Sequence, residues 1–107
     1  MMKVKFANGT KKDCSAPAEQ KLFKTNAGAL VPAGWVLTFR MNGETTSSEL
    51  DELLTKENVS TLEFIEESES ITESYTISGY DTVTSLVIRH SSNPDMTSAE
   101  IQLSKGV

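Results

Sequence analysis

The amino-acid sequence predicts an α+β fold, mainly an antiparallel β-sandwich or half-open barrel with one short helix. Apolar and polar residues alternate in several short runs with the period of two that is typical of strands, and residues typical of turns separate these runs. One acidic stretch near the middle of the chain instead has leucines at helical spacing. With 107 residues, 37% of them apolar, the chain has the size and composition of one folded domain over residues 1–107.

The first predicted element is a β-hairpin over residues 3–14, because an Asn-Gly pair interrupts an alternating run. A three-residue Asn-Gly-Thr loop would set Val4 opposite Cys14, so that two apolar side chains meet. The same register would set Lys5 opposite Asp13, which pairs opposite charges. We therefore predict this register in preference to that of a two-residue turn, and with it a buried cysteine thiol.

Residues 15–34 are rich in Ala, Gly and Pro, and this composition predicts a loop in which only residues 21–25 could form a short strand. The next stretch has a different pattern. From Trp35 to Met41, large apolar residues alternate with Val, Thr and Arg until an Asn-Gly pair ends the run. This pattern predicts a core strand with one buried face.

A short helix is predicted to begin at residues 46–49, where Thr-Ser-Ser-Glu can form a capping box. Leu50, Leu53 and Leu54 form one narrow apolar stripe, and the helix is expected to end near residues 56–58. Because an isolated helix of this length is marginal in water, we expect the stripe to pack on a sheet.

Four more strands are predicted over residues 59–66, 71–78, 82–90 and 98–105. The Leu-Val-Ile run at 86–88 is long enough to be buried on both faces of a sheet, and the acidic residues 66–70 form the turn between the first two strands. Alternation and the helical stripe together predict a core made of Val4, Phe6, Trp35, Leu37, Phe39, Leu50, Leu53, Leu62, Phe64, Ile77, Leu86, Ile88, Ile101 and Leu103.

Charge is distributed unevenly along the chain, whose net charge is −5. Residues 1–43 hold seven basic and two acidic residues, a net +5, whereas residues 44–107 hold three basic and thirteen acidic residues, a net −10. In one interpretation the basic strands lie beside the acidic strands within the fold and form weak surface pairs. In the other interpretation, a basic patch and an acidic patch occupy opposite faces, and copies of the chain stack head to tail into a ring.

The sequence contains no arrangement typical of catalysis, and we predict that the protein is not an enzyme and has no catalytic residues. Neither the one histidine, His90, nor the one cysteine, Cys14, is accompanied by a spaced set of metal ligands, and no Gly-rich phosphate loop is present. We therefore expect no metal and no cofactor. We also expect no membrane segment or signal peptide, and no direct binding of nucleic acid by so acidic a chain.

Several short segments, in their order along the chain, resemble a group of small proteins encoded by phages and prophages of Gram-positive, especially clostridial, bacteria. They are Met-Lys-Val-Lys-Phe-Ala-Asn-Gly-Thr at 2–10 with Cys14, Val-Leu-Thr-Phe at 36–39, Ser-Glu-Leu-Asp-Glu-Leu at 48–53 leading to Glu-Asn-Val-Ser at 57–60, Tyr-Thr-Ile-Ser-Gly-Tyr at 75–80 and Ile-Gln-Leu-Ser-Lys at 101–105. The resemblance implies a product of the virion tail module and supplies no catalytic residues.

We accordingly predict a phage-encoded structural or accessory virion protein of the tail, which acts by protein–protein binding. The alternative is a small acidic inhibitor of a host nucleic-acid enzyme, an anti-CRISPR or other anti-defence factor, whose glutamates imitate a phosphate backbone. The expected partner is another virion component or a further copy of the chain, and for the alternative a host nuclease. The expected location is the host bacterial cytoplasm, with assembly into the virion. The predicted partner-binding residues are Glu63, Glu66, Glu67, Glu69 and Glu73.

Overall fold

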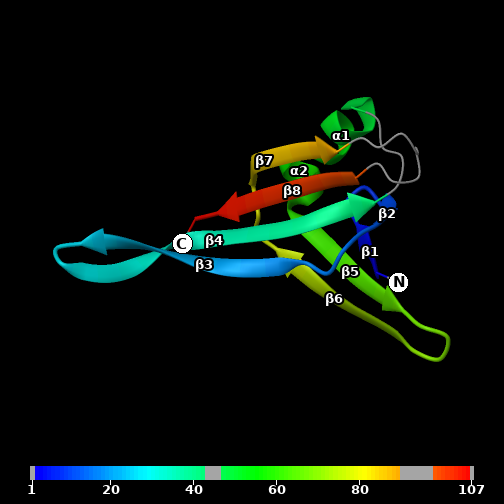
Figure 1. The fold of residues 1–107 in the computed structure, drawn as a ribbon, viewed down its shortest axis with the longest axis horizontal. Helices are drawn as coiled ribbons and strands as arrows, with labels where there is room; N and C mark the ends of the chain where they lie inside the picture. Colours follow the sequence, from blue (N-terminus) through cyan, green and yellow to red (C-terminus); the bar gives the residue numbers. More distant parts are fainter. Residues whose placement is uncertain (1, 43–46, 90–97, 107) are drawn as a thin grey trace.

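Two four-stranded antiparallel sheets make up the protein in a computed structural model that describes residues 2–42, 47–89 and 98–106 (Figure 1). The first sheet has the strand order β2-β1-β5-β6, and the second has the order β3-β4-β8-β7. The strands are β1 (Met2–Lys5), β2 (Lys11–Asp13), β3 (Ala18–Asn26), β4 (Ala29–Asn42), β5 (Thr61–Glu67), β6 (Thr72–Ser78), β7 (Thr82–Arg89) and β8 (Ser98–Lys105). The predicted mainly antiparallel β fold is confirmed, and the described strands do not close into a barrel.

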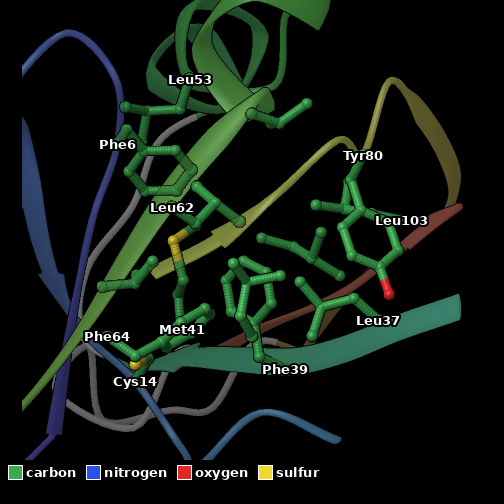
Figure 2. Packing of buried hydrophobic residues seen from close by; sticks show 14 of the residues in the cluster. Phe6, Cys14, Leu37, Phe39, Met41, Leu53, Leu62, Phe64, Tyr80 and Leu103 are labelled. Atoms are coloured by element: carbon green, nitrogen blue, oxygen red, sulfur yellow. The ribbon is translucent and has the colours of Figure 1, made fainter. Parts of the chain in front are cut away.

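The inner faces of the two sheets pack into one hydrophobic core (Figure 2). Phe39 of β4 and Phe64 of β5 meet edge to face across the two sheets, with ring centroids 5.5 Å apart. Tyr75 of β6 stacks on Phe64 at 5.8 Å. The predicted core residues that are buried are Val4, Phe6, Leu37, Phe39, Leu50, Leu53, Leu62, Phe64, Ile77, Ile101 and Leu103.

Three predicted core residues lie elsewhere. Trp35 is exposed because it occupies the last position at which β4 still pairs with β8. Leu86 is exposed and Ile88 only partly buried because β7 is an edge strand, so the prediction that this strand is buried on both faces is wrong. Met41 and Tyr80, absent from the predicted core, are fully buried.

The predicted register of the first hairpin is also wrong. Val4 lies opposite Lys12 rather than Cys14, because the loop is Ala-Asn-Gly at 7–9 and not Asn-Gly-Thr. Gly9 takes the left-handed position (φ 93°) that ends such a loop, and its N–H donates to the Phe6 carbonyl. The register is shifted by two residues, which keeps every side chain on its expected face. Cys14 is therefore still buried, as predicted.

Residues 15–34 do not form the predicted loop. Most of them belong to β3 and to the first half of β4, which form a long hairpin that turns at Ala27 and Gly28. Both turn residues have positive φ, 53° and 81°, as a type I′ turn requires. The feature of the sequence that indicates this turn is the Ala-Gly pair between two strand-like runs. The high Ala, Gly and Pro content of the whole segment makes this pair hard to recognise.

Two short helices, α1 (Ser47–Leu53) and α2 (Lys56–Val59), replace the single predicted helix. Leu50 and Leu53 of α1 are buried against the core, as predicted. The chain begins a new helix after Thr55, whose Oγ1 accepts a hydrogen bond from the N–H of Asn58 at 3.3 Å. The predicted capping box at 46–49 lies partly outside the described residues.

Candidate interaction surface

The β3–β4 hairpin projects beyond the rest of the fold (Figure 1). Residues 29–34 of β4 pair only with β3, because pairing with β8 begins at Trp35. Six residues of strand reach about 20 Å. The radius of gyration is 15.3 Å, whereas a compact chain of this length would have about 13 Å. We refer to residues 22–34 as the arm.

Large apolar side chains on and beside the arm are open to solvent. Leu30 is 74% exposed, Phe23 is 55% exposed and Trp35, at the base of the arm, is 36% exposed. Strand alternation and pairing place these three side chains on one face, the face that continues the inner side of the sheet. Leu22, also exposed, lies on the other face.

Two lysines give the arm a positive charge. Lys21 lies at the base of the arm, with its Nζ 5.6 Å from the ring centroid of Phe23 and 5.9 Å from that of Trp35. Such contacts between a cation and aromatic rings favour a fixed arrangement of the three side chains. Lys24 is exposed on the arm itself, and residues 21–35 contain no acidic residue.

The predicted partner-binding glutamates gather on the β5–β6 hairpin, on both of its faces. Glu66 lies directly opposite Glu73, on the face that carries the Phe64 and Tyr75 rings. Glu67 points to the other face by alternation, and Glu69 lies in the turn. The exposed residues Glu66, Glu67, Glu69 and Glu73 are called the acidic end below.

Glu63 is separated from the acidic end. It is half-buried in the middle of β5 and lies opposite Lys5 of β1. Two ion pairs also join the basic and acidic parts of the chain, Lys12 to Glu49 at 3.5 Å and Arg40 to Glu100 at 3.7 Å. These contacts agree with the interpretation in which basic strands lie beside acidic ones.

Exposed apolar side chains also accompany the acidic end. Ile71, in the turn, is 57% exposed. Tyr75 lies two residues after Glu73, on the same face of β6, and is 46% exposed. The molecule thus has two projecting hairpins with exposed apolar residues, one basic and one acidic. The glutamates of the acidic hairpin are clustered in the sequence, whereas the composition of residues 15–34 predicts a loop and does not indicate the basic hairpin.

Of the two residues considered for chemistry, Cys14 lies within the described residues and is not placed to react. The Cys14 thiol is buried, and this burial, with smaller effects of Asp13 and Glu66, raises its pKa to about 12. A thiol with so high a pKa stays protonated and is a poor nucleophile at neutral pH. His90 lies outside the described residues. Within 2–42, 47–89 and 98–106, no three His, Cys, Asp or Glu side chains are grouped to hold a metal ion.

An open hollow of about 360 Å³ lies between the first hairpin and the helices, lined in part by Glu52, Glu57 and Asn58. The buried Asn58 side chain forms hydrogen bonds within the protein there. Its Nδ2 donates to the Leu53 carbonyl at 2.9 Å, and its Oδ1 accepts from the N–H of Asn8 at 2.8 Å. These bonds join the hairpin loop to the helices, so Asn58 has a structural role in the hollow.

Comparison with known proteins gives no match. No protein-family model, no curated protein and no solved structure matches this chain. The resemblance to small phage tail-module proteins therefore stays a prediction. Neither of the two helices in the described ranges is long enough to cross a membrane.

Proposed function

We propose that this protein is a structural or accessory assembly protein that acts by binding another protein rather than by catalysis. The observation that carries the proposal is the group of exposed side chains on the arm, Phe23 and Leu30, and at its base, Trp35. An exposed group of large apolar residues typically marks an interaction site, and aromatic residues are enriched in such sites. A free two-stranded hairpin is marginally stable in water. A partner that covers the arm would stabilise it.

The resemblance to proteins of phage tail modules supports a more specific form of the proposal. In this form, the protein is made in the cytoplasm of a bacterial host and is assembled into the virion tail. A projecting arm suits this role, because an arm can reach a neighbouring subunit while the core of its own fold stays unchanged. The core supports this separation, since none of its residues lies between Cys14 and Leu37.

The alternative, an acidic inhibitor of a host nuclease, receives less support. A phosphate mimic requires negative charges spread over one face that a basic protein can contact. Here the glutamates lie on two faces of one hairpin, and Glu63 lies opposite Lys5. The basic, apolar arm has no part in that alternative, so assembly is the function that accounts for more of the surface.

The proposal is tested by following the protein into purified phage particles. Mass spectrometry of particles from a host that carries the wild-type gene should detect the chain. The double variant Phe23→Ser/Leu30→Ser should be reduced at least about tenfold in particles, because it removes two exposed contacts worth about 1.4 kcal/mol or more in total. Circular dichroism of the purified variant should show an unchanged fold.

The matched control is Val87→Ser, which makes another exposed apolar side chain polar, on β7 at a site away from the arm. This variant should enter particles at the wild-type level. If the wild-type chain is absent from particles, the virion role is wrong. If the arm variant enters as well as the control, the arm is not the binding surface.

A further inference from the structure

We infer that the partner of the arm is a second copy of this chain, whose acidic end receives it. This inference rests on the proposed function and names its partner. The two surfaces differ in charge and resemble each other in their exposed apolar residues. The arm and its base carry Lys21 and Lys24 with no acidic residue, whereas residues 66–73 carry four glutamates with no basic residue.

The apolar parts of the two surfaces are also suited to each other. The arm and its base offer Phe23, Leu30 and Trp35, and Ile71 and Tyr75 lie beside the acidic end. Contact between them would remove five large apolar side chains from water, with charged residues at the rim. Interfaces between proteins commonly have this arrangement, an apolar centre that includes aromatic residues and a polar rim.

The contact must join two molecules. Figure 1 shows the tips of the β3–β4 and β5–β6 hairpins at opposite ends of the long axis of the molecule, so one chain cannot bring its own arm onto its own acidic end. The molecule measures 51 × 34 × 23 Å along its principal axes. The two surfaces of one molecule are therefore both available to neighbours.

The charges also determine which surfaces meet. Two arms would place lysines against lysines, and two acidic ends would place glutamates against glutamates, so a symmetric contact of either kind is disfavoured. Only the unlike pair is attractive. Because each copy has one surface of each kind, the contact is head to tail, and it continues into a ring or an open filament.

The test begins with the oligomeric state of the purified full-length chain. Analytical ultracentrifugation between about 1 and 100 μM should show association that increases with concentration. The association should weaken when sodium chloride is raised from about 50 mM to about 500 mM, because exposed charges are then screened. A chain that stays monomeric over this whole range would overturn the inference.

Two charge-reversed variants then identify the surfaces. Lys21→Glu/Lys24→Glu reverses the arm, and Glu69→Lys/Glu73→Lys neutralises the acidic end, as two glutamates remain there. Each variant alone should associate at least about tenfold more weakly than the wild type, since two attractive rim pairs are lost. The matched control Glu52→Lys/Glu57→Lys changes the charge by the same amount on the helices and should associate as the wild type does.

A mixture of the two variants gives the sharpest result. The intact arm of the Glu69→Lys/Glu73→Lys chain can bind the intact acidic end of the Lys21→Glu/Lys24→Glu chain, and the two altered surfaces also carry opposite charges at the exchanged positions. The mixture should therefore associate at least about tenfold more strongly than either variant alone. A mixture that stays monomeric, or association that survives both reversals, would overturn the inference.

Failure of this inference can be told from failure of the proposed function. If the wild-type chain is monomeric but the amount of Phe23→Ser/Leu30→Ser in phage particles is still reduced, the arm binds a different protein and only the inference is wrong. If that variant enters particles normally, the proposed function of the arm is wrong as well.

Discussion

The hydroxyl of Tyr80 donates a 2.9 Å hydrogen bond to the carboxylate of Glu19, 61 positions away in the sequence. Tyr80 follows β6 and Glu19 lies near the start of β3, so the bond joins the first sheet to the strand that continues into the arm. Lys105 completes the group: its Nζ lies 4.5 Å from the Tyr80 ring centroid and donates a 3.0 Å hydrogen bond to the Ser78 carbonyl oxygen. The base of the arm is thus fixed by a buried aromatic ring.

Replacing Tyr80 with Phe removes this hydrogen bond and keeps the ring in the core. The free energy of unfolding should fall by about 0.5–1.5 kcal/mol, the usual net contribution of one such bond. Urea denaturation followed by circular dichroism measures the change. The control Tyr75→Phe alters a hydroxyl on a half-exposed ring and should change stability by only a few tenths of a kcal/mol. Equal midpoints for the two variants would contradict the structural role of the bond.

Stability should fall as the pH rises above about 9, because the side chains of Cys14, Tyr75 and Tyr80 hold their protons more tightly in the folded state. Burial raises the pKa of Cys14 from 9.0 to about 12. Burial, the hydrogen bond to Glu19 and the Glu19 charge raise that of Tyr80 above its usual 10.0. Between the usual and the raised pKa values the unfolded chain has lost protons that the folded chain still binds, so deprotonation favours unfolding.

Urea midpoints at pH of about 8 and about 10.5 measure this dependence. The Cys14→Ala variant lacks one of these groups, so its midpoint should fall less over this interval than that of the wild type. A fall of the same size in both proteins would show that the thiol ionises equally in the folded and unfolded states.

The Cys14 thiol should also resist modification in the folded protein. It is buried beside Met41, and only the thiolate reacts quickly with an aromatic disulfide reagent. At neutral pH the native protein should react at least about a hundredfold more slowly than the protein in urea, as expected for a group that is exposed only on opening. Rapid reaction of the native protein would show that the thiol faces solvent.

Replacing Leu53 with Ala should lower the free energy of unfolding by about 2–5 kcal/mol, the range for large cavities in a core. Leu53 is fully buried in the core that Figure 2 shows, near Phe6. The neighbouring Leu54 is only partly buried and serves as the control, since Leu54→Ala should cost less. A loss below half a kcal/mol for Leu53→Ala would place α1 outside the core.

Replacing Gly34 with Ala should destabilise the base of the arm by about 1–3 kcal/mol. Gly34 has φ 137°, and an added Cβ would lie too close to the Lys105 carbonyl oxygen, so β4 and β8 would have to separate. The control is Gly28→Ala in the turn, where φ is also positive but nothing lies near the added methyl group. Thermal unfolding should show a larger loss for Gly34→Ala than for the control.

The sequence predicted best where a strand has one buried face. Alternation located β5, β6 and β8 to within about two residues at their ends, because a period of two is unambiguous there. The position of β7 was predicted equally well, but its burial on both faces was not, since a run of three apolar residues is compatible with both a central strand and an edge strand. Sequence alone does not reveal which neighbour a strand has.

The candidate surface was only half predictable. Clustered glutamates are visible in the sequence without any fold, so the acidic end was found. Predicting the arm would have required two facts that the sequence does not supply. Ala27 and Gly28 adopt left-handed conformations, which Ala seldom does, and Phe23 is left exposed by the described sheets. The exposure of Phe23, Leu30 and Trp35 depends on tertiary structure, whereas strand alternation alone predicts that Trp35 lies in the core.

The separation of the arm from the core has a consequence for how the protein can change over time. Because the described core draws no side chain from residues 15–36, substitutions in the arm alter what the protein contacts while leaving the packing of the two sheets intact. Selection can then act on the arm almost independently of fold stability. Related chains would be expected to keep the residues around Phe39 and Phe64 while their hairpins diverge in length and sequence, and an experimenter could graft a foreign hairpin at the same place.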